Sequence, residues 1–295
     1  MKKIPVLATI REACDFTFTH LGAIIGLIWL PMILITVIGF FVLQRFFDAY
    51  AGALASGSAA SMGPESLGVL CFFVAVLLLS TMMAVPVTQL ALGTRKQGAL
   101  VYFSFGALEW RLFRGLMGLV GFLLLPLLVV SVLTGLLAAA NGGPLGPANG
   151  ATAIMAIYGV LLCATIFFGL RFGTLLPALA VSENTSVLPR AWKLSAGNFW
   201  RILAVILAIF IPLQVFSAAI LFAVEGPQAM TPDLHPSSAM AAAQLHAFAM
   251  NMPLSSGINF LFAPLWVGLL LGAGASIYRN LSDNVLAPPK ADILA

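Results

Sequence analysis

The stretch of this chain with the most chemistry covers residues 171–201, where one very apolar segment ends and the next begins. Arg171 lies inside the first of these segments, and an arginine at such a position costs about 2.5–3.5 kcal/mol to insert into a bilayer. Its side chain could bind an anion or pair with Glu183, the one carboxylate of the stretch. Alternatively, it extends its guanidinium to the cytoplasmic headgroups, and we favour this interpretation.

The second half of the stretch has the pattern of a short amphipathic helix at the membrane surface, over residues 186–198. Ser186 is suited to cap this helix, and Pro189 is tolerated in its first turn. Tryptophans beside basic residues are typical of segments that contact anionic headgroups or a partner. The candidate contact residues are Arg171, Glu183, Arg190, Trp192, Lys193, Trp200 and Arg201.

Motifs for catalysis are missing from the sequence. It contains no GxxxxGK[ST] loop, no HExxH, no GxSxG and no histidine paired with a carboxylate on one helical face. All acidic residues fall at the ends of apolar segments or between them, which disfavours proton- or cation-coupled carriers, since these use buried carboxylates. We therefore expect no catalytic, cofactor or metal site, and we interpret the three well-separated cysteines as packing residues.

One segment between apolar runs does collect soft metal ligands. These are Met230, His235, Met240, His246, Met250 and Met252. Copper would suit such ligands. Residues 236–251 also have the pattern of an alanine-rich helix resting on the outer membrane surface, with methionines as its apolar face, and we favour this second interpretation.

The composition places these features in a membrane. Of the 295 residues, 61% are hydrophobic and only 8% are charged, whereas soluble domains carry roughly 25% charged residues. The mean hydropathy is +1.06. A soluble core cannot bury that much apolar surface, and the net charge of +4 is therefore no argument for nucleic-acid binding.

We predict an all-α polytopic membrane protein with six transmembrane helices, arranged as three hairpins with cytoplasmic interfacial helices. The expected spans are 20–43, 67–92, 112–139, 152–181, 199–224 and 254–278, within a domain over residues 20–281. Residues 1–19 are expected to be retained as an interfacial helix, because polar and apolar side chains occupy different faces of residues 5–18. Residues 282–295 would form a short cytoplasmic tail.

The basic residues determine the predicted orientation. All except Arg45 fall at one end of the six spans, and cytoplasmic segments of membrane proteins are enriched in lysine and arginine. This rule places both termini in the cytoplasm of a bacterial cell, with the protein in its inner membrane.

Two further patterns concern how the helices pack. Each hairpin has one proline in each span, and interfacial segments at residues 5–18, 98–109 and 186–198 precede the three hairpins, which suggests a threefold repeat. Three glycine pairs have the GxxxG spacing that permits close helix crossing, and at least one pair should pack in this way. The pairs are Gly22/Gly26, Gly169/Gly173 and Gly268/Gly272.

The sequence around residues 171–201 resembles a segment of uncharacterised bacterial inner-membrane proteins and of the membrane domain attached to some glycerophosphodiester phosphodiesterases. In these proteins a span ends in Arg and Pro, an acidic residue follows, and a helix similar to AWxLSxGxFWR leads into the next span. The matching residues are Arg171, Pro177, Glu183, Ala191, Trp192, Leu194, Ser195, Gly197, Phe199, Trp200 and Arg201. The resemblance implies a six-helix membrane domain without the catalytic barrel, and hence no hydrolase activity.

These observations leave two functional hypotheses. The first is a non-enzymatic scaffold, assembly partner or envelope-homeostasis factor that contacts the lipid bilayer, its anionic headgroups and a membrane-protein partner. The second is a transporter or channel for a small or lipid-like solute. The transporter requires a polar cavity near Arg171, Gln89, Gln214 or Asn259.

Overall fold

The computed structural model describes residues 3–56, 62–95, 104–140, 150–183, 187–225 and 238–282. Within these ranges the chain forms helices and no strand. The helices are α1 (Val6–Thr19), α2 (Leu21–Ser56), α3 (Met62–Ala91), α4 (Ala107–Ala140), α5 (Gly150–Gly173), α6 (Leu176–Ser182), α7 (Val187–Ser195), α8 (Phe199–Glu225) and α9 (Ser238–Leu281).

The predicted fold class is confirmed. Six segments are long and apolar enough to cross a membrane, one each in α2, α3, α4, α8 and α9 and one that joins α5 to α6. Helices are the expected form of such segments, because lipid offers no hydrogen-bond partners and an α-helix satisfies its backbone internally. The chain is therefore a polytopic all-α membrane protein.

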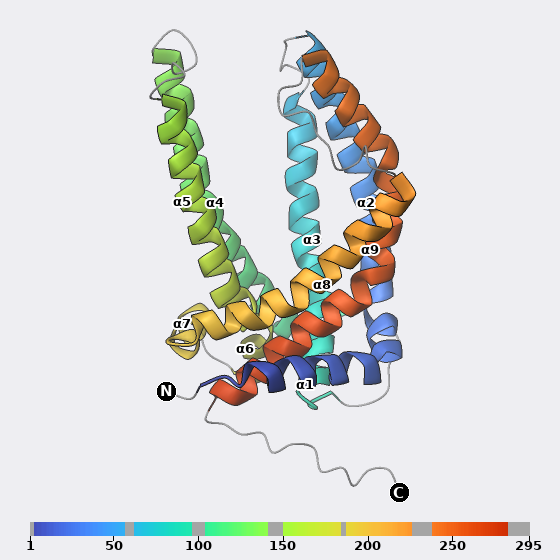
Figure 1. Cartoon of the computed structure of the whole chain (residues 1–295), viewed down its shortest axis with the longest axis vertical. Coiled ribbons are helices and arrows are strands. Elements are labelled where there is room, and N and C mark those ends of the chain that lie inside the picture. The colour runs from blue at the N-terminus through green and yellow to red at the C-terminus, as the bar shows by residue number, and fades with distance from the viewer. Residues whose placement is uncertain are drawn as a thin grey trace, which may run out of the picture.

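Neighbouring spans of the three expected hairpins contact each other, α2 with α3, α4 with α5, and α8 with α9, but α9 packs most extensively against α2. Figure 1 shows that the hairpins do not form a parallel bundle. The α4–α5 hairpin makes one limb, α2, α3 and α9 make another, and α8 runs obliquely between them. The limbs come together at one end of the molecule and diverge toward the other, and α1 lies crosswise at the end where they meet (Figure 1). We call this end, with α1, α6, α7 and the adjoining ends of the spans, the base.

Most of the tight packing is at the base. α6 has five consecutive buried residues, Leu176–Ala180. All of them except Pro177 belong to a cluster that also contains Leu112 of α4, Val205 of α8 and Ile277 of α9. Farther from the base, large apolar side chains of α4 are exposed, with Leu125 at 63% and Leu136 at 62%. Such side chains suit contact with lipid tails, which are as apolar as leucine.

The expected span over residues 152–181 is not one continuous helix. α5 ends at Gly173 and α6 begins at Leu176, with Pro177 in its first turn. Pro177 contributes to the break, because its ring has no N–H to donate and is crowded by the carbonyl four residues earlier. A proline alone does not determine it, since α2 continues through Pro31. The hydropathy of the segment continues across the break and does not reveal it.

The helices also extend beyond the expected spans. α2 continues to Ser56, and α9 contains 44 residues from Ser238 to Leu281. The helix expected over residues 236–251 is found from Ser238 on, where it is continuous with the last span. Its position on the outer membrane surface stays a prediction. At 1.5 Å per residue α9 is about 66 Å long. It contains Pro253 and Pro264 and changes direction along its length (Figure 1).

Helices are found at two of the three segments expected to lie at the membrane surface. α1 precedes α2, and α7 precedes α8. Of the third expected segment, residues 98–103 lie outside the described residues and 104–106 are not helical. The threefold repeat therefore stays a prediction, and the tail over residues 283–295 likewise lies outside the described residues.

One of the three glycine pairs packs as expected. A Cβ at Gly268 would lie 2.6 Å from Cγ2 of Thr17, and one at Gly272 would lie 2.8 Å from Cδ1 of Phe16. These glycines allow α1 to lie directly against α9. By contrast, nothing lies within 4 Å of a Cβ built at Gly22, Gly169 or Gly173.

This contact gives a stability prediction. Gly268→Ala should lower the free energy of unfolding by about 1–3 kcal/mol, because the added methyl group has no room beside Thr17. Gly257→Ala is the matched control on the same helix, since nothing lies within 4 Å of a Cβ there. It should raise the stability by up to about 1 kcal/mol through helix propensity. Unfolding in detergent measures both, and equal effects of the two substitutions would refute the close contact.

Candidate functional site

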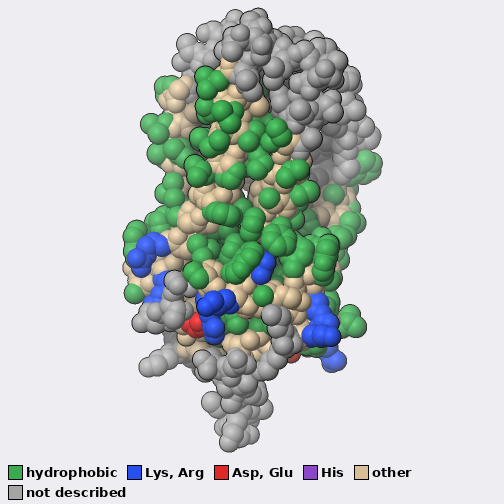
Figure 2. All heavy atoms as spheres, turned by 90° about the vertical axis from the view of Figure 1, so that its left-hand side faces the viewer, with side chains coloured by type: hydrophobic (Ala, Val, Ile, Leu, Met, Phe, Trp, Pro, Cys, Tyr) green, Lys and Arg blue, Asp and Glu red, His purple; other side chains and the backbone are tan. Residues whose placement is uncertain are grey.

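Basic side chains gather at the base. Figure 2 shows lysine and arginine in a band beneath a hydrophobic surface. Arg45 lies apart from this band, because the 24 residues that separate it from the start of α2 correspond to about 36 Å of helix. Such a band at one end of an apolar body is typical of a membrane–water boundary.

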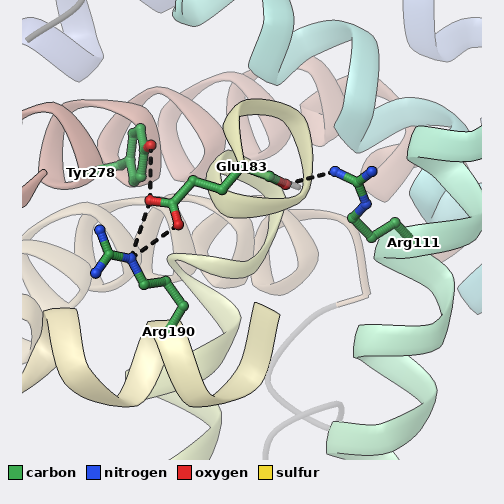
Figure 3. A network of polar contacts seen from close by, with 4 residues as sticks. All are labelled: Arg111, Glu183, Arg190 and Tyr278. Atoms are coloured by element: carbon green, nitrogen blue, oxygen red, sulfur yellow. Dashed lines mark hydrogen bonds and ion pairs between the residues drawn. The ribbon is translucent and has the colours of Figure 1, made fainter. Parts of the chain in front are cut away.

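The centre of the base is the carboxylate of Glu183, which follows the last turn of α6. Nε of Arg190 on α7 donates to both of its oxygens, at 3.2 Å to Oε1 and 3.0 Å to Oε2. The hydroxyl of Tyr278 on α9 donates to Oε1 at 3.2 Å (Figure 3). The side chain of Glu183 is only 12% exposed, and that of Arg190 is 40% exposed. A carboxylate so shielded requires these partners, because an unpaired buried charge is very unfavourable.

Arg111 connects the same residue to α4 through the backbone. Its Nη1 donates to the carbonyl oxygen of Glu183 at 2.6 Å and to that of Ala180 at 3.2 Å. The last carbonyls of a helix have no partner within the helix, and a nearby arginine can satisfy them. Glu183 thus links α4, α6, α7 and α9. We call Arg111, Glu183, Arg190 and Tyr278 the Glu183 network (Figure 3).

The structure places Arg171 away from this network. Its Nε donates to Oγ of Ser195 at 2.7 Å, and its Nη2 donates to the carbonyl of Trp192 at 3.2 Å. Its guanidinium carbon lies 3.5 Å from the centroid of the Trp192 ring. The interpretation of Arg171 as the partner of Glu183 is therefore wrong. Arg171 lies in the last turn of α5, where it meets the C-terminal end of α7.

Two sets of contacts attach the N-terminal segment to the base. Oε2 of Glu12 accepts hydrogen bonds from Ser276 at 2.7 Å and from Arg279 at 3.2 Å. Nη1 of Arg201 donates to the carbonyl of Ile4 at 3.3 Å. The N–H of Ile4 donates to Oδ1 of Asn198, also at 3.3 Å. These bonds fix α1 across the ends of α8 and α9.

A few residues of the base still face outward. The exposed fractions are 45% for Trp110, 42% for Trp192 and 76% for Trp200. Arg114 is exposed with its guanidinium carbon 5.7 Å from the Trp110 ring, and Lys193 is exposed on α7. We call these five residues the rim. Of the basic residues predicted as contacts, Arg171, Arg190 and Arg201 each form a hydrogen bond within the protein. Their predicted contacts with lipid or a partner stay predictions.

The polar residues required by a transport path lie on four different helices. Gln89 is half-buried near the end of α3, while Gln214 on α8 and Asn259 on α9 are exposed. Arg171 is bonded to α7. Across the described ranges no group of three or more His, Cys, Asp or Glu could hold a metal ion. Met230 and His235, from the alternative copper site, lie outside those ranges.

Sequence reasoning identified Glu183 and Arg190 but missed Arg111, Tyr278, Ser276 and Asn198. Tyr278 lies 95 positions from Glu183 along the chain, and Arg111 lies 72 positions away. No local spacing can reveal such contacts. The nearest signal was the position of Arg111 and Tyr278 at the basic ends of their spans.

Comparison of the chain with protein-family models, curated proteins and solved structures found no match. The resemblance to the membrane domain of glycerophosphodiester phosphodiesterases therefore stays a prediction.

Removing the charge of Glu183 should destabilise the base. Glu183→Gln should lower the free energy of unfolding by about 2 kcal/mol, because the charge-assisted bonds to Arg190 are lost in a shielded position. Asp15→Asn removes the exposed pair of Asp15 with Arg11, whose side chains are 71% and 85% exposed, and should cost less than about 0.5 kcal/mol. Detergent-based unfolding followed by tryptophan fluorescence compares the two variants. Similar losses would show that Glu183 has no special role.

Proposed function

We propose that this protein is a non-enzymatic scaffold or assembly partner of the bacterial inner membrane, with both termini in the cytoplasm and a role in envelope homeostasis. The observation that carries the proposal is how the cations of the base are used. Arg111, Arg190 and Arg279 bond to backbone carbonyls and carboxylates of neighbouring helices. They build a fixed platform, whereas the rim is left to face the membrane surface.

The rim has the chemistry for anionic headgroups. Tryptophan is favoured at the membrane–water boundary because its ring is apolar and its N–H is polar. A lysine or arginine near an anionic leaflet contributes about 1 kcal/mol. Arg114 and Lys193 are therefore the cations best suited to this contact. Arg190, by contrast, is bound to Glu183, and its replacement would disturb the fold.

Support for the orientation comes from the basic band (Figure 2). The positive-inside rule assigns such a band to the cytoplasmic side. The predicted resemblance supports the non-enzymatic role, since it implies a membrane domain without a catalytic unit. The transporter hypothesis receives less support, because Gln214 and Asn259 are exposed and lie on different helices.

Replacing the two rim cations tests the proposal. The double variant Arg114→Gln and Lys193→Gln should lose about five-fold in preference for phosphatidylglycerol over phosphatidylcholine per charge removed. Native mass spectrometry of the protein from mixed-lipid nanodiscs measures this preference.

Two controls accompany this measurement. Arg114→Lys with Lys193→Arg keeps the charge and should keep the preference. Arg45→Gln removes a cation far from the base and should change nothing. The proposal fails if the double glutamine variant retains its lipid preference, or if Arg45→Gln loses it equally.

A further inference from the structure

An open apolar groove lies between α5 and the beginning of α8. Its volume is ≈ 840 Å³, within the range of about 300–1,000 Å³ found for small-molecule sites. Apolar side chains line both walls. They include Val160, Cys163, Ala164 and Phe167 from α5, and Trp200 and Leu203 from α8.

The groove is open along the apolar surface of the candidate spans. Val160 at its upper end is 70% exposed, and Trp200 near its lower end is 76% exposed. From Val160 to Phe168 the lining extends about 12 Å along α5. Gly197 forms the lower end of the groove and contributes no side chain to it. Its positive φ of 73° lets the chain turn from α7 into α8.

The side chain of Arg171 lies beside Phe167, near the lower end of the groove. The guanidinium carbon of Arg171 lies 5.7 Å from the ring centroid of Phe167, which lines the groove. Two of the five N–H donors of Arg171 are used, for Ser195 and for the Trp192 carbonyl. Among the described residues none accepts a hydrogen bond from its Nη1. The stacked Trp192 ring fixes the plane of the guanidinium.

The combination matches one class of molecule. An apolar groove suits an acyl chain, and arginine donors at its end suit the oxygens of a phosphodiester, which arginine binds with two parallel hydrogen bonds. A zwitterionic headgroup would bring a second cation close to Arg171, whereas an anionic headgroup would not. The matching ligand is therefore a phospholipid with net negative charge.

The fold leaves room for such a ligand. α5 and α8 spread apart from the base (Figure 1), and the most apolar stretch of α4 is only 6% buried. The α4–α5 hairpin thus meets the rest of the protein mainly at the base. The groove lies where α5 and α8 separate, so an acyl chain in it would contact both.

We propose that the groove between α5 and α8 holds one anionic phospholipid, with an acyl chain along Ala164 and Phe167 and its phosphate on Nη1 of Arg171. This inference deepens the proposed function and rests on the same orientation, with the lipid in the cytoplasmic leaflet. The groove site depends on other residues than the proposed function does, since the rim cations Arg114 and Lys193 do not line the groove.

Native mass spectrometry with phosphatidylglycerol tests this site through two independent variants. Arg171→Gln removes the phosphate contact, and Ala164→Trp fills the groove without changing the charge. Each should lower the retention of one phosphatidylglycerol per chain at least about ten-fold. Ala208→Trp, at an exposed position of α8 outside the groove, and Arg45→Gln are the matched controls and should retain it.

The unmodified protein provides a second readout through its own thiols. Cys163 lines the groove, whereas Cys71 is exposed on α3. Phosphatidylglycerol should slow the alkylation of Cys163 by N-ethylmaleimide and leave the rate at Cys71 unchanged. Arg171→Gln should abolish this protection. The comparison of the unmodified protein with and without lipid leaves the contacts of Arg171 with α7 intact.

Three outcomes would overturn the inference. Ala164→Trp could retain phosphatidylglycerol as well as Ala208→Trp does. Cys163 could react at the same rate with and without the lipid. Excess inorganic phosphate could displace the lipid, which would show that Arg171 recognises phosphate without an acyl chain. If any of these occurs while the rim variant still loses its preference, the proposed function stands without the groove site.

Discussion

The pairing of one shielded carboxylate determines how this protein is held together. Glu183 is a charge at the edge of an apolar body, and it is stable there because Arg190 and Tyr278 donate to it while Arg111 binds its carbonyl. These three residues come from α7, α9 and α4. The pairing therefore sets the relative positions of elements that lie far apart in the sequence.

These polar contacts are important because the solvent around the spans is lipid. Within a bilayer, apolar helices gain little by leaving lipid for one another, because lipid tails are as apolar as leucine. The diverging limbs agree with this, since α4 and α5 expose apolar side chains far from the base. Specific positions come instead from hydrogen bonds at the base and from close crossings such as that of α1 over Gly268 and Gly272. Glu12 and Arg201 add the bonds that hold the N-terminal segment in place.

The sequence predicts the parts of the fold that depend on the bilayer. Six apolar runs and a one-sided distribution of basic residues are sufficient for the spans and for the basic end. Hydropathy marks where lipid contacts the chain and not where a helix ends, which is why α9 begins at Ser238, well before the expected span. It also fails at Pro177, where the helix breaks although the apolar run continues.

The partners of the charged residues depend on tertiary contacts and were less predictable. The sequence indicated Arg171 and Glu183 as residues of interest, but Arg171 donates to Ser195 of α7 and not to Glu183. The sequence does not indicate a role for Tyr278, because that role is a hydrogen bond to Glu183, which lies 95 positions away. The apolar lining between α5 and α8 looks, in sequence, like any other membrane-facing surface.

The most direct test of the central role of Glu183 is hydrogen–deuterium exchange of the protein in nanodiscs, with and without Glu183→Gln. We expect the substitution to raise exchange together in α6, in α7 and in the first turns of α4, because one carboxylate connects these elements. Exchange in the central part of α2 should stay the same. An increase confined to α7, or no increase at all, would contradict the view that Glu183 holds the base together.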